Sequence, residues 1–336
     1  MATLRVLSLN VNSLLPRGRS RLPLLADILS KHNVDVALVQ ETLLTARRRA
    51  SIQGYRHYRT NKTDNSRGLS MFVKETLRHS QLATPRTEQL QAQVVNIEAG
   101  AAPITIVNAY NSNHGGMDVN ELETLLQTGK RVLIAGDLNA KHSSWQSEDT
   151  QGRHQNAAGI KLHNHCAANN YYIIAPTTPT RTDPRTGNTS TLDIALASKI
   201  PYYITAESLP CIGSDHNPVL LTVHAPPRHA TPEPRLNYKR ADWPRFGRNV
   251  HEKLTTRRFN TESEVDQGVT HLTTAIQEAM HAAIPNTTST RAPDELPPHL
   301  QELKRSKNAA KRRWIRSHRT ADRTATTSPG NYSNGK

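Results

Sequence analysis

The feature of this sequence that most restricts its fold is a series of short apolar runs that recurs from the N-terminus to about Val223. Each run is rich in β-branched or aliphatic residues and is bounded by Gly, Pro, Asn or Asp, which is typical of buried strands. The runs are LRVLSLNV, VDVALVQ, GLSMFVK, ITIVNAY, RVLIAGD, YYIIAP, TLDIALA and PVLLTVH. Between them, RLPLLADILSKHN and NELETLLQTG carry apolar residues at helical spacing. The pattern predicts one many-stranded α/β unit.

A change of composition near Arg228 predicts a domain boundary. From APPRHATPEPR onward the strand-like runs stop, and Pro, Arg and Thr predominate as they do in linkers. We therefore expect a first domain over residues 1–228 and a basic helical tail over residues 229–336. Two helices are predicted in the tail, within FNTESEVDQGVTHLTTAIQEAMHAAIP and LPPHLQELKRSKNAAKRRWIRSHRTADR, and the last residues have a disordered composition.

The charge balance points to a polyanionic partner, and nucleic acid is the first candidate. The chain has 43 Lys and Arg residues against 28 Asp and Glu residues, a formal net charge of +15. The tail is the more basic part per residue. A basic run in its second helix is expected to contact nucleic acid, although a solvated helix face explains the run equally well. Its residues are Lys304, Arg305, Lys307, Lys311, Arg312, Arg313 and Arg316.

Cysteine content argues against a disulfide-rich protein, and hydropathy argues against a membrane-spanning protein. Cys166 and Cys211 are too few and too far apart for a disulfide framework or a Cys-x-x-Cys metal site, which favours a reducing compartment. The N-terminus lacks the apolar core of a signal peptide, and no apolar run reaches the ~20 residues of a membrane span. We expect an intracellular protein that has no membrane partner. Its oligomeric state stays open.

Acidic and amide residues stand at the ends of several apolar runs. A turn would explain any one of them, because Asp, Asn and Ser hydrogen-bond to their own backbone. Strand ends at one edge of a layered sheet share a crevice, however, and carboxylates gathered there repel one another unless a cation lies between them. Together they predict a metal site that handles phosphate. The positions are Asn10, Glu41, Asp137, Asn139, Asp215 and His216.

The order of these motifs resembles the exonuclease–endonuclease–phosphatase superfamily, and within it the apurinic-endonuclease-like domain of Jockey-type non-LTR retrotransposons. The resemblance covers about residues 1–225 and rests on LNVN, VQET, VNAYNSN, GDLNAKH, STLDIAL and GSDHNPV. It implies a four-layer sandwich of two packed mixed β-sheets flanked by helices. The tail is similar to the connector that leads to a reverse transcriptase in such polyproteins. Because no Tyr/Phe-Ala-Asp-Asp signature occurs, we expect a truncated or partial element product.

The resemblance also implies an activity and a set of site residues. The expected activity is a Mg²⁺-dependent DNA endonuclease, with Mn²⁺ as an alternative ion, that nicks duplex target DNA and leaves a 3′-hydroxyl primer for retrotransposition. The implied metal ligands are Glu41, Asn10 and Asp215. The implied catalytic residues are Asp137 as the base for water, Asn139 beside it, His216 paired with Asp193, and Tyr110. The implied substrate contacts are Asn113, Ser214 and Thr180.

Such an enzyme would act on double-stranded DNA in the nucleus, with a cytoplasmic ribonucleoprotein stage and element RNA bound through the tail as further expectations. Two alternatives stay open: an apurinic repair endonuclease or phosphatase of the same superfamily, and a catalytically dead fragment that binds nucleic acid. The chain departs from the family's pattern in one loop. Where relatives usually have a Gly-Gly pair, NSRGLSMFV has Arg67 in the first position, which predicts an altered loop.

Overall fold

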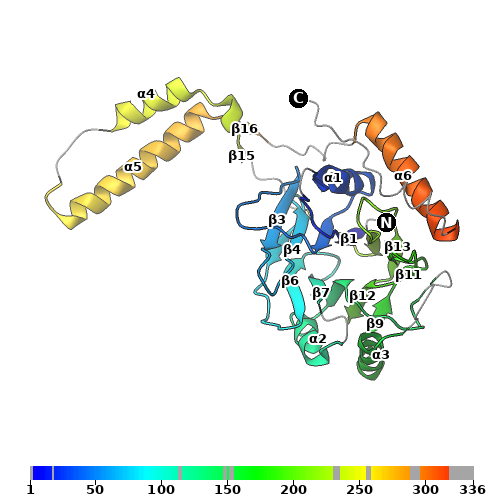
Figure 1. The fold of residues 1–336 in the computed structure, drawn as a ribbon. Coiled ribbons are helices and arrows are strands. Elements are labelled where there is room, and N and C mark those ends of the chain that lie inside the picture. The colour runs from blue at the N-terminus through cyan, green and yellow to red at the C-terminus, as the bar shows by residue number, and fades with distance from the viewer. Residues whose placement is uncertain are drawn as a thin grey trace. The chain divides into compact units, whose positions relative to one another are not determined.

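The computed structural model describes residues 3–16, 19–112, 116–146, 150, 155–229, 235–254, 259–287 and 296–317. The chain forms two compact units, one of residues 1–230 with residues 291–336 and the other of residues 231–290. This division differs from the boundary predicted at residue 228, because the last helix, α6 (Pro298–Ser317), belongs to the first unit. Figure 1 shows the elements of each unit.

The first of two six-stranded sheets contains the N-terminal strand. Its strands are β1 (Leu4–Asn10), β2 (Val36–Gln40), β3 (Tyr55–Thr60), β4 (Leu69–Lys74), β13 (Ile204–Ser208) and β14 (Val219–Val223). They lie in the order β13-β14-β1-β2-β4-β3. Strands β1 and β2 are parallel and the other neighbours are antiparallel, so the sheet is mixed.

The second sheet is built the same way around another parallel pair. Its strands are β5 (His79–Gln81), β6 (Leu90–Ile97), β7 (Ile104–Asn111), β8 (Val132–Asp137), β9 (Tyr172–Ile174) and β12 (Asp193–Ser198). The order is β5-β6-β7-β8-β12-β9, with β7 and β8 parallel. A short hairpin of β10 (Arg181–Thr182) and β11 (Thr189–Ser190) completes the strands of this unit.

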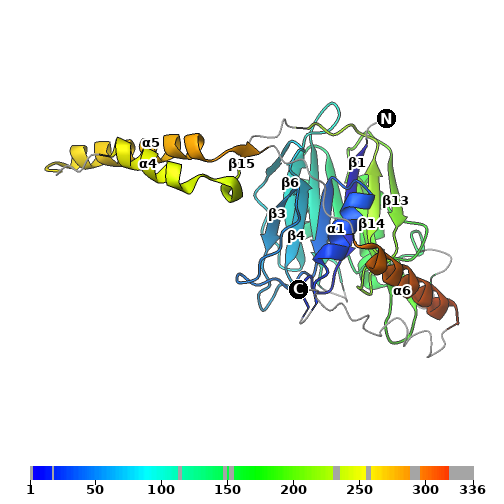
Figure 2. The same ribbon diagram turned by 90° about the horizontal axis from the view of Figure 1, so that it is seen from above.

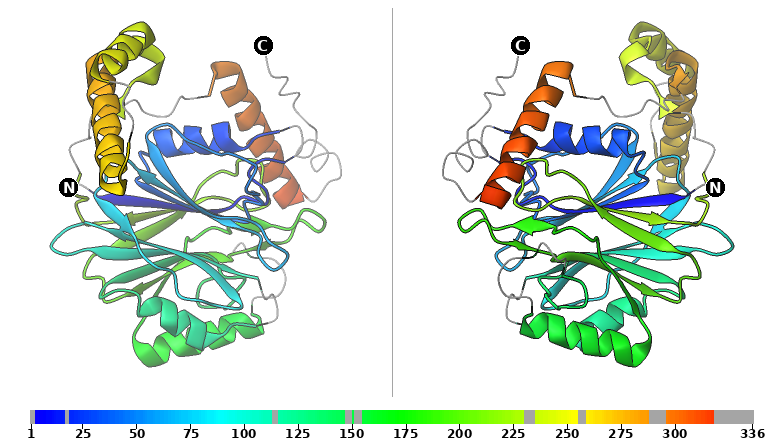
Figure 3. Two further views of the ribbon diagram at one scale, coloured as in Figure 1. Left: turned by 90° about the vertical axis from the view of Figure 1, so that its left-hand side faces the viewer. Right: turned by 90° about the vertical axis from the view of Figure 1, so that its right-hand side faces the viewer.

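The two sheets pack face to face and carry helices on their outer faces (Figure 3). Helix α1 (Leu22–Lys31) packs on the first sheet, and α2 (Val119–Leu126) and α3 (Ala157–Asn169) pack on the second. Strand β1 is apolar on both faces because Leu4 and Val6 face the other sheet while Leu7 and Leu9 face α1. The predicted four-layer sandwich is confirmed.

The second unit is a helical hairpin. It contains β15 (Arg235–Leu236), a 3₁₀ turn (Tyr238–Arg240), α4 (Trp243–Lys253), α5 (Glu262–Ala283) and β16 (Asn286–Thr287). Asp242 and Thr261 cap the two helices by accepting backbone N–H bonds, which is why each helix begins where it does. Across the residues described in the two units, no helix is both long enough and apolar enough to cross a membrane.

A buried carboxylate joins α6 to α1, which lie over the same face of the first sheet (Figure 2). Asp27 of α1 is fully buried and accepts hydrogen bonds from Lys304 Nζ at 2.9 Å and from the Leu296 backbone N–H at 3.3 Å. Burial would raise the pKa of Asp27, but the ammonium groups of Lys304 and Lys31 hold it below its usual value. Trp314 and Ala310 of α6 are buried as well. These contacts explain why α6 belongs to the first unit.

We expect Asp27→Asn to loosen α6, because the change removes one charge of a buried ion pair and costs about 1–3 kcal/mol. Hydrogen exchange by mass spectrometry should show faster exchange in residues 298–317 and unchanged exchange in β1 and β8. Glu302→Gln, on an exposed position of α6, is the matched control and should leave both rates unchanged. Slow exchange of α6 in the Asp27 variant would contradict this account of its docking.

Candidate active site

The site lies where strand ends of the two sheets meet. Asn10 is the last residue of β1, Glu41 follows β2, and Asp137 is the last residue of β8. The Asn10 side-chain amide donates to Glu41 Oε1 at 3.0 Å and to Asp137 Oδ2 at 2.9 Å, and it therefore links the first sheet to the second. The parallel pairs β1–β2 and β7–β8 place these carboxyl ends together, as the sequence predicted.

His216 lies between two buried carboxylates. Its Nδ1 is 2.8 Å from Asp193 Oδ2 and its Nε2 is 3.7 Å from Asp137 Oδ2. Asp193 is brought to this point because it begins β12 and pairs in register with Asp137. Burial alone would lower the pKa of His216, but Asp193 and Asp137 together raise it to about 9. The ring is therefore an imidazolium at neutral pH.

Asp137 is a buried acid whose carboxylate lies on the Nε2 side of His216. Burial raises its pKa to about 6, while His216 and the Asn10 amide favour the ionised form. The backbone N–H of Asn139 donates to Asp137 Oδ1 at 3.0 Å, so one carboxylate oxygen is held by the chain that follows β8. Such a carboxylate is ionised near neutral pH and can accept a proton in a reaction.

The loops that follow these strands hold unusual backbone conformations. Asn12, Glu41 and Asn139 have φ values of 43°, 51° and 48°. Non-glycine residues rarely adopt this left-handed region, and it recurs at functional sites where the surrounding structure enforces it. Backbone bonds enforce it here, since the Ser13 N–H donates to the Glu41 carbonyl at 2.8 Å.

Glu41 offers the carboxylate oxygens that fit a hard divalent cation, and Asn10 would add an oxygen donor with its amide turned over, because its Nδ2 now points at Glu41 Oε1. The buried phenol of Tyr110 lies against Glu41, and burial together with this carboxylate raises the Tyr110 pKa, so Tyr110 stays a neutral donor. The site already attracts a cation, because Arg67 Nε lies 2.6 Å from Glu41 Oε2. Arg67 stands in the position where the sequence analysis predicted an altered loop.

A second group of potential ligands is Asp137, Asp193 and His216, whose ligand atoms lie within 4.8 Å of one another. Both ring nitrogens of His216 face carboxylates, and its raised pKa keeps both protonated. An imidazolium has no lone pair for a metal. The Glu41–Asn10 pair is therefore the better metal site of the two.

The other predicted site residues fall into different places. Asp215 does not join Glu41; its Oδ2 is 3.1 Å from Arg181 Nε, and this arginine and His216 hold the Asp215 pKa low although burial would raise it. Ser214 Oγ donates to the Asn10 carbonyl at 2.8 Å and so fixes the loop to β1. Thr180 is fully buried and donates to Asp193 Oδ2 at 2.6 Å, which leaves it no face for a substrate. Asn113 lies outside the described residues.

Three residues that complete the site carry no signal in the sequence. Arg181 pairs with Asp215, and the Asn12 amide donates to the same carboxylate at 3.5 Å. Arg21, the N-cap residue of α1, donates to the carbonyls of Ser13 and Gly213, each at 2.7 Å, and ties the two site loops together. Each of the three contacts a residue at least 34 positions away in sequence, so no spacing rule finds these contacts.

The basic residues of α6 are not equivalent. Lys304 pairs with Asp27, and Arg305 pairs with Glu302 on an exposed part of the helix. Lys311 Nζ donates at 3.4 Å to Oδ1 of Asn217, the residue that follows His216. Lys307 is close to Gly213, and Arg312 lines a cavity with Lys311, whereas Arg313 is exposed. The Arg316 side chain lies outside the described part of the chain.

We expect Arg67→Ala to bind Mn²⁺ roughly threefold to tenfold more tightly, because the change removes a positive charge that competes for Glu41. Titration followed by electron paramagnetic resonance of free Mn²⁺ measures this directly and needs no substrate. Arg47→Ala, an exposed arginine of the neighbouring loop, is the matched control and should bind like the unaltered chain. Equal or weaker binding by the Arg67 variant would mean that Arg67 does not compete with a cation.

Comparison with known proteins identifies a family and a fold that match this chain. A sequence model of the Endonuclease/Exonuclease/phosphatase family matches residues 7–216. The catalytic domain of Xenopus laevis APE2 has a TM-score of 0.50 at 18% sequence identity, over 68% of this chain and 94% of that one. At this identity the likeness shows the fold alone.

Two curated sequences extend the match beyond residue 216. The "Probable RNA-directed DNA polymerase from transposon BS" of Drosophila melanogaster is 28% identical over 306 residues, which are 87% of this chain and 33% of that protein. The "RNA-directed DNA polymerase from mobile element jockey" of Drosophila funebris is 27% identical over 315 residues, 90% of this chain and 33% of that one. The chain thus spans about a third of the length of these relatives.

Proposed function

Because the chain belongs to the endonuclease/exonuclease/phosphatase family, we propose that it is a metal-dependent DNA endonuclease that nicks duplex DNA. The observation that carries the proposal is the arrangement of His216 between Asp193 and Asp137, beside the Glu41–Asn10 pair. It offers a carboxylate that can take a proton and a cation that can meet a phosphate, with Asp137 Oδ2 and His216 Nε2 3.7 Å apart.

The side chains divide the work of hydrolysing a phosphodiester. Asp137, oriented by Asn10 and the Asn139 N–H, takes a proton from the attacking water. The His216 imidazolium, held by Asp193, donates to a non-bridging phosphoryl oxygen and stabilises the charge that develops there. Tyr110 stays protonated and donates to the phosphate. Mg²⁺ bound by Glu41 and Asn10, or Mn²⁺ in its place, would neutralise charge on the leaving oxygen.

The relatives favour a mobile-element enzyme over a repair enzyme. Both curated relatives carry names of RNA-directed DNA polymerases from mobile elements. A polymerase extends only a 3′-hydroxyl, so the nick that serves it must break the bond between phosphorus and the 3′ oxygen. We therefore propose that the chain supplies 3′-hydroxyl primers for retrotransposition and that its target is chromosomal DNA in the nucleus.

The test is nicking of supercoiled plasmid with Mg²⁺, followed by direct extension with a DNA polymerase and direct resealing with a ligase. Chelation by EDTA should stop the nicking. Asp137→Asn and His216→Gln should each lower the rate by roughly 10²-fold or more, since each removes a group that acts in the transition state. Asp266→Asn and His271→Gln, the same changes on exposed positions of α5, are the matched controls.

Other products would point elsewhere. Cleavage confined to abasic sites would indicate a repair endonuclease, and release of phosphate from 3′ ends without nicking would indicate a phosphatase. A chain that binds DNA and leaves it intact would be the inactive fragment. Each of these outcomes contradicts the proposal.

The pH dependence follows from the two titrating groups of the site. Activity requires ionised Asp137, so the nicking rate should rise as the pH passes about 6. It also requires protonated His216, so the rate should fall as the pH passes about 9. The two apparent pKa values belong to the coupled pair. Single-turnover nicking measures the profile, and residual activity of His216→Gln should lack the fall at high pH. A rate that keeps rising beyond pH 9 would show that the His216 proton is not needed.

A further inference from the structure

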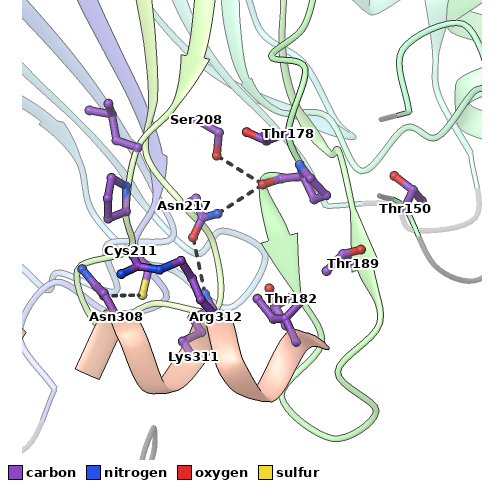
Figure 4. A pocket seen from close by; sticks show the side chains of 14 residues that line it. Thr150, Thr178, Thr182, Thr189, Ser208, Cys211, Asn217, Asn308, Lys311 and Arg312 are labelled. Atoms are coloured by element: carbon purple, nitrogen blue, oxygen red, sulfur yellow. Dashed lines mark hydrogen bonds between the residues drawn. The ribbon is translucent and has the colours of Figure 1, made fainter. Parts of the chain in front are cut away.

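Two lysines of α6 lie at the two ends of the loop that carries Asp215 and His216. A Cβ atom built on Gly213 would lie 3.9 Å from Lys307 Nζ. Lys311 Nζ donates to Asn217 Oδ1 at 3.4 Å, and Figure 4 labels both residues. The lysines are four positions apart and so lie on the same face of the helix, about 6 Å apart along its axis. The helix therefore runs beside the catalytic loop.

A cavity opens on each side of this contact. One, of about 850 Å³, lies between α6 and the β10–β11 hairpin and is lined by Thr182, Thr189, Asn217, Lys311 and Arg312 among others (Figure 4). The other, of about 310 Å³, is lined by Arg19, Arg21, Lys304 and Lys307 among others. Neither lining includes an Asp or Glu residue. Hydroxyl, amide and cationic groups of this kind bind phosphate oxygens.

The two lysines differ from three neighbouring cations in what neutralises their charge. Lys304 pairs with Asp27, Arg305 pairs with Glu302, and the Arg21 guanidinium is occupied by backbone carbonyls. Within the described residues, neither Lys307 nor Lys311 makes an ion pair with an acid. Burial is the main cause that lowers the pKa of Lys307, and the neighbouring cations Arg21 and Lys311 lower it further.

We propose that α6 forms one wall of the DNA-binding groove, and that Lys307 and Lys311 bind backbone phosphates of the DNA beside the phosphodiester that is cut. The inference rests on the proposed function. It gives a substrate-binding role to a helix that lies beyond residues 7–216, where the family match ends. DNA is favoured over RNA because the lysines flank the loop of His216, so the nucleic acid they meet is the one that is cut.

The experiment measures binding of a short fluorescein-labelled DNA duplex by anisotropy, in EDTA, over a series of salt concentrations. Lys307→Gln and Lys311→Gln should each weaken binding by roughly threefold to tenfold and lower the log–log salt slope by about 0.9, the value for one lost phosphate contact. Arg305→Gln removes the same charge from an exposed position of α6 and should change binding less than twofold. Lys307→Arg and Lys311→Arg keep the charge and should retain the affinity.

Nicking kinetics separate this inference from the proposed function. If both hold, the two glutamine variants raise KM for plasmid and change kcat by less than about twofold, because the lysines bind the substrate outside the reacting bond. Normal nicking with unchanged binding in both variants would overturn the α6 inference and leave the proposed function standing. An equal loss of affinity in Arg305→Gln would also overturn the α6 inference, because it would indicate unspecific electrostatic attraction. A loss of affinity seen only with single-stranded RNA would overturn it as well. Absence of nicking in the unaltered chain would overturn the proposed function, while the binding data would still decide the role of α6.

Discussion

One imidazolium balances two buried carboxylates at the edge where the sheets meet, and the arrangement of the whole site depends on this balance. An unpaired charge as deeply buried as Asp137 or Asp193 would strongly destabilise the fold. The antiparallel register of β12 with β8 places Asp193 opposite Asp137, and the loop before β14 brings His216 to them. The fold and the proposed mechanism therefore both need a protonated His216, because the proton that faces Asp137 is the one that the mechanism offers to a phosphate.

Local sequence patterns predicted a many-stranded α/β unit with polar residues at its strand ends, and the family resemblance implied the four-layer sandwich. Strand periodicity marks each run, and polar residues at the run ends mark the crevice, so Asn10, Glu41, Asp137 and His216 were brought together as expected. The contacts that side chains make within loops were not predicted. Thr180 lies behind Asp193 instead of facing a substrate, and Asp215 pairs with Arg181, because the hairpin of residues 181–190 pairs back onto the catalytic loop. No local pattern encodes such a pairing.

The docking of α6 was missed for a related reason. Asp27 stands within the apolar run LLADILS, and a carboxylate at a buried position of a helix is a sign that a cation must reach it from elsewhere. The cation is Lys304, 277 residues further along the chain. A buried carboxylate of this kind indicates that a cationic partner exists, but it does not say which residue the partner is. For Arg67, the sequence showed that the loop departs from the family's pattern, but it did not predict the contact of Arg67 with Glu41.

The cover that α6 provides has a further consequence for the chemistry of sulfur in this protein. Cys211 is buried, and its thiol lies 3.5 Å from Asn308 Oδ1 of α6, so the helix shields it from oxidants. A chain shortened before residue 296 would lose that shield and expose a thiol two residues from Gly213. Peroxide or a second exposed thiol could then reach the loop of His216. The last helix thus covers the Cys211 thiol at the same time as it contacts the loop of His216.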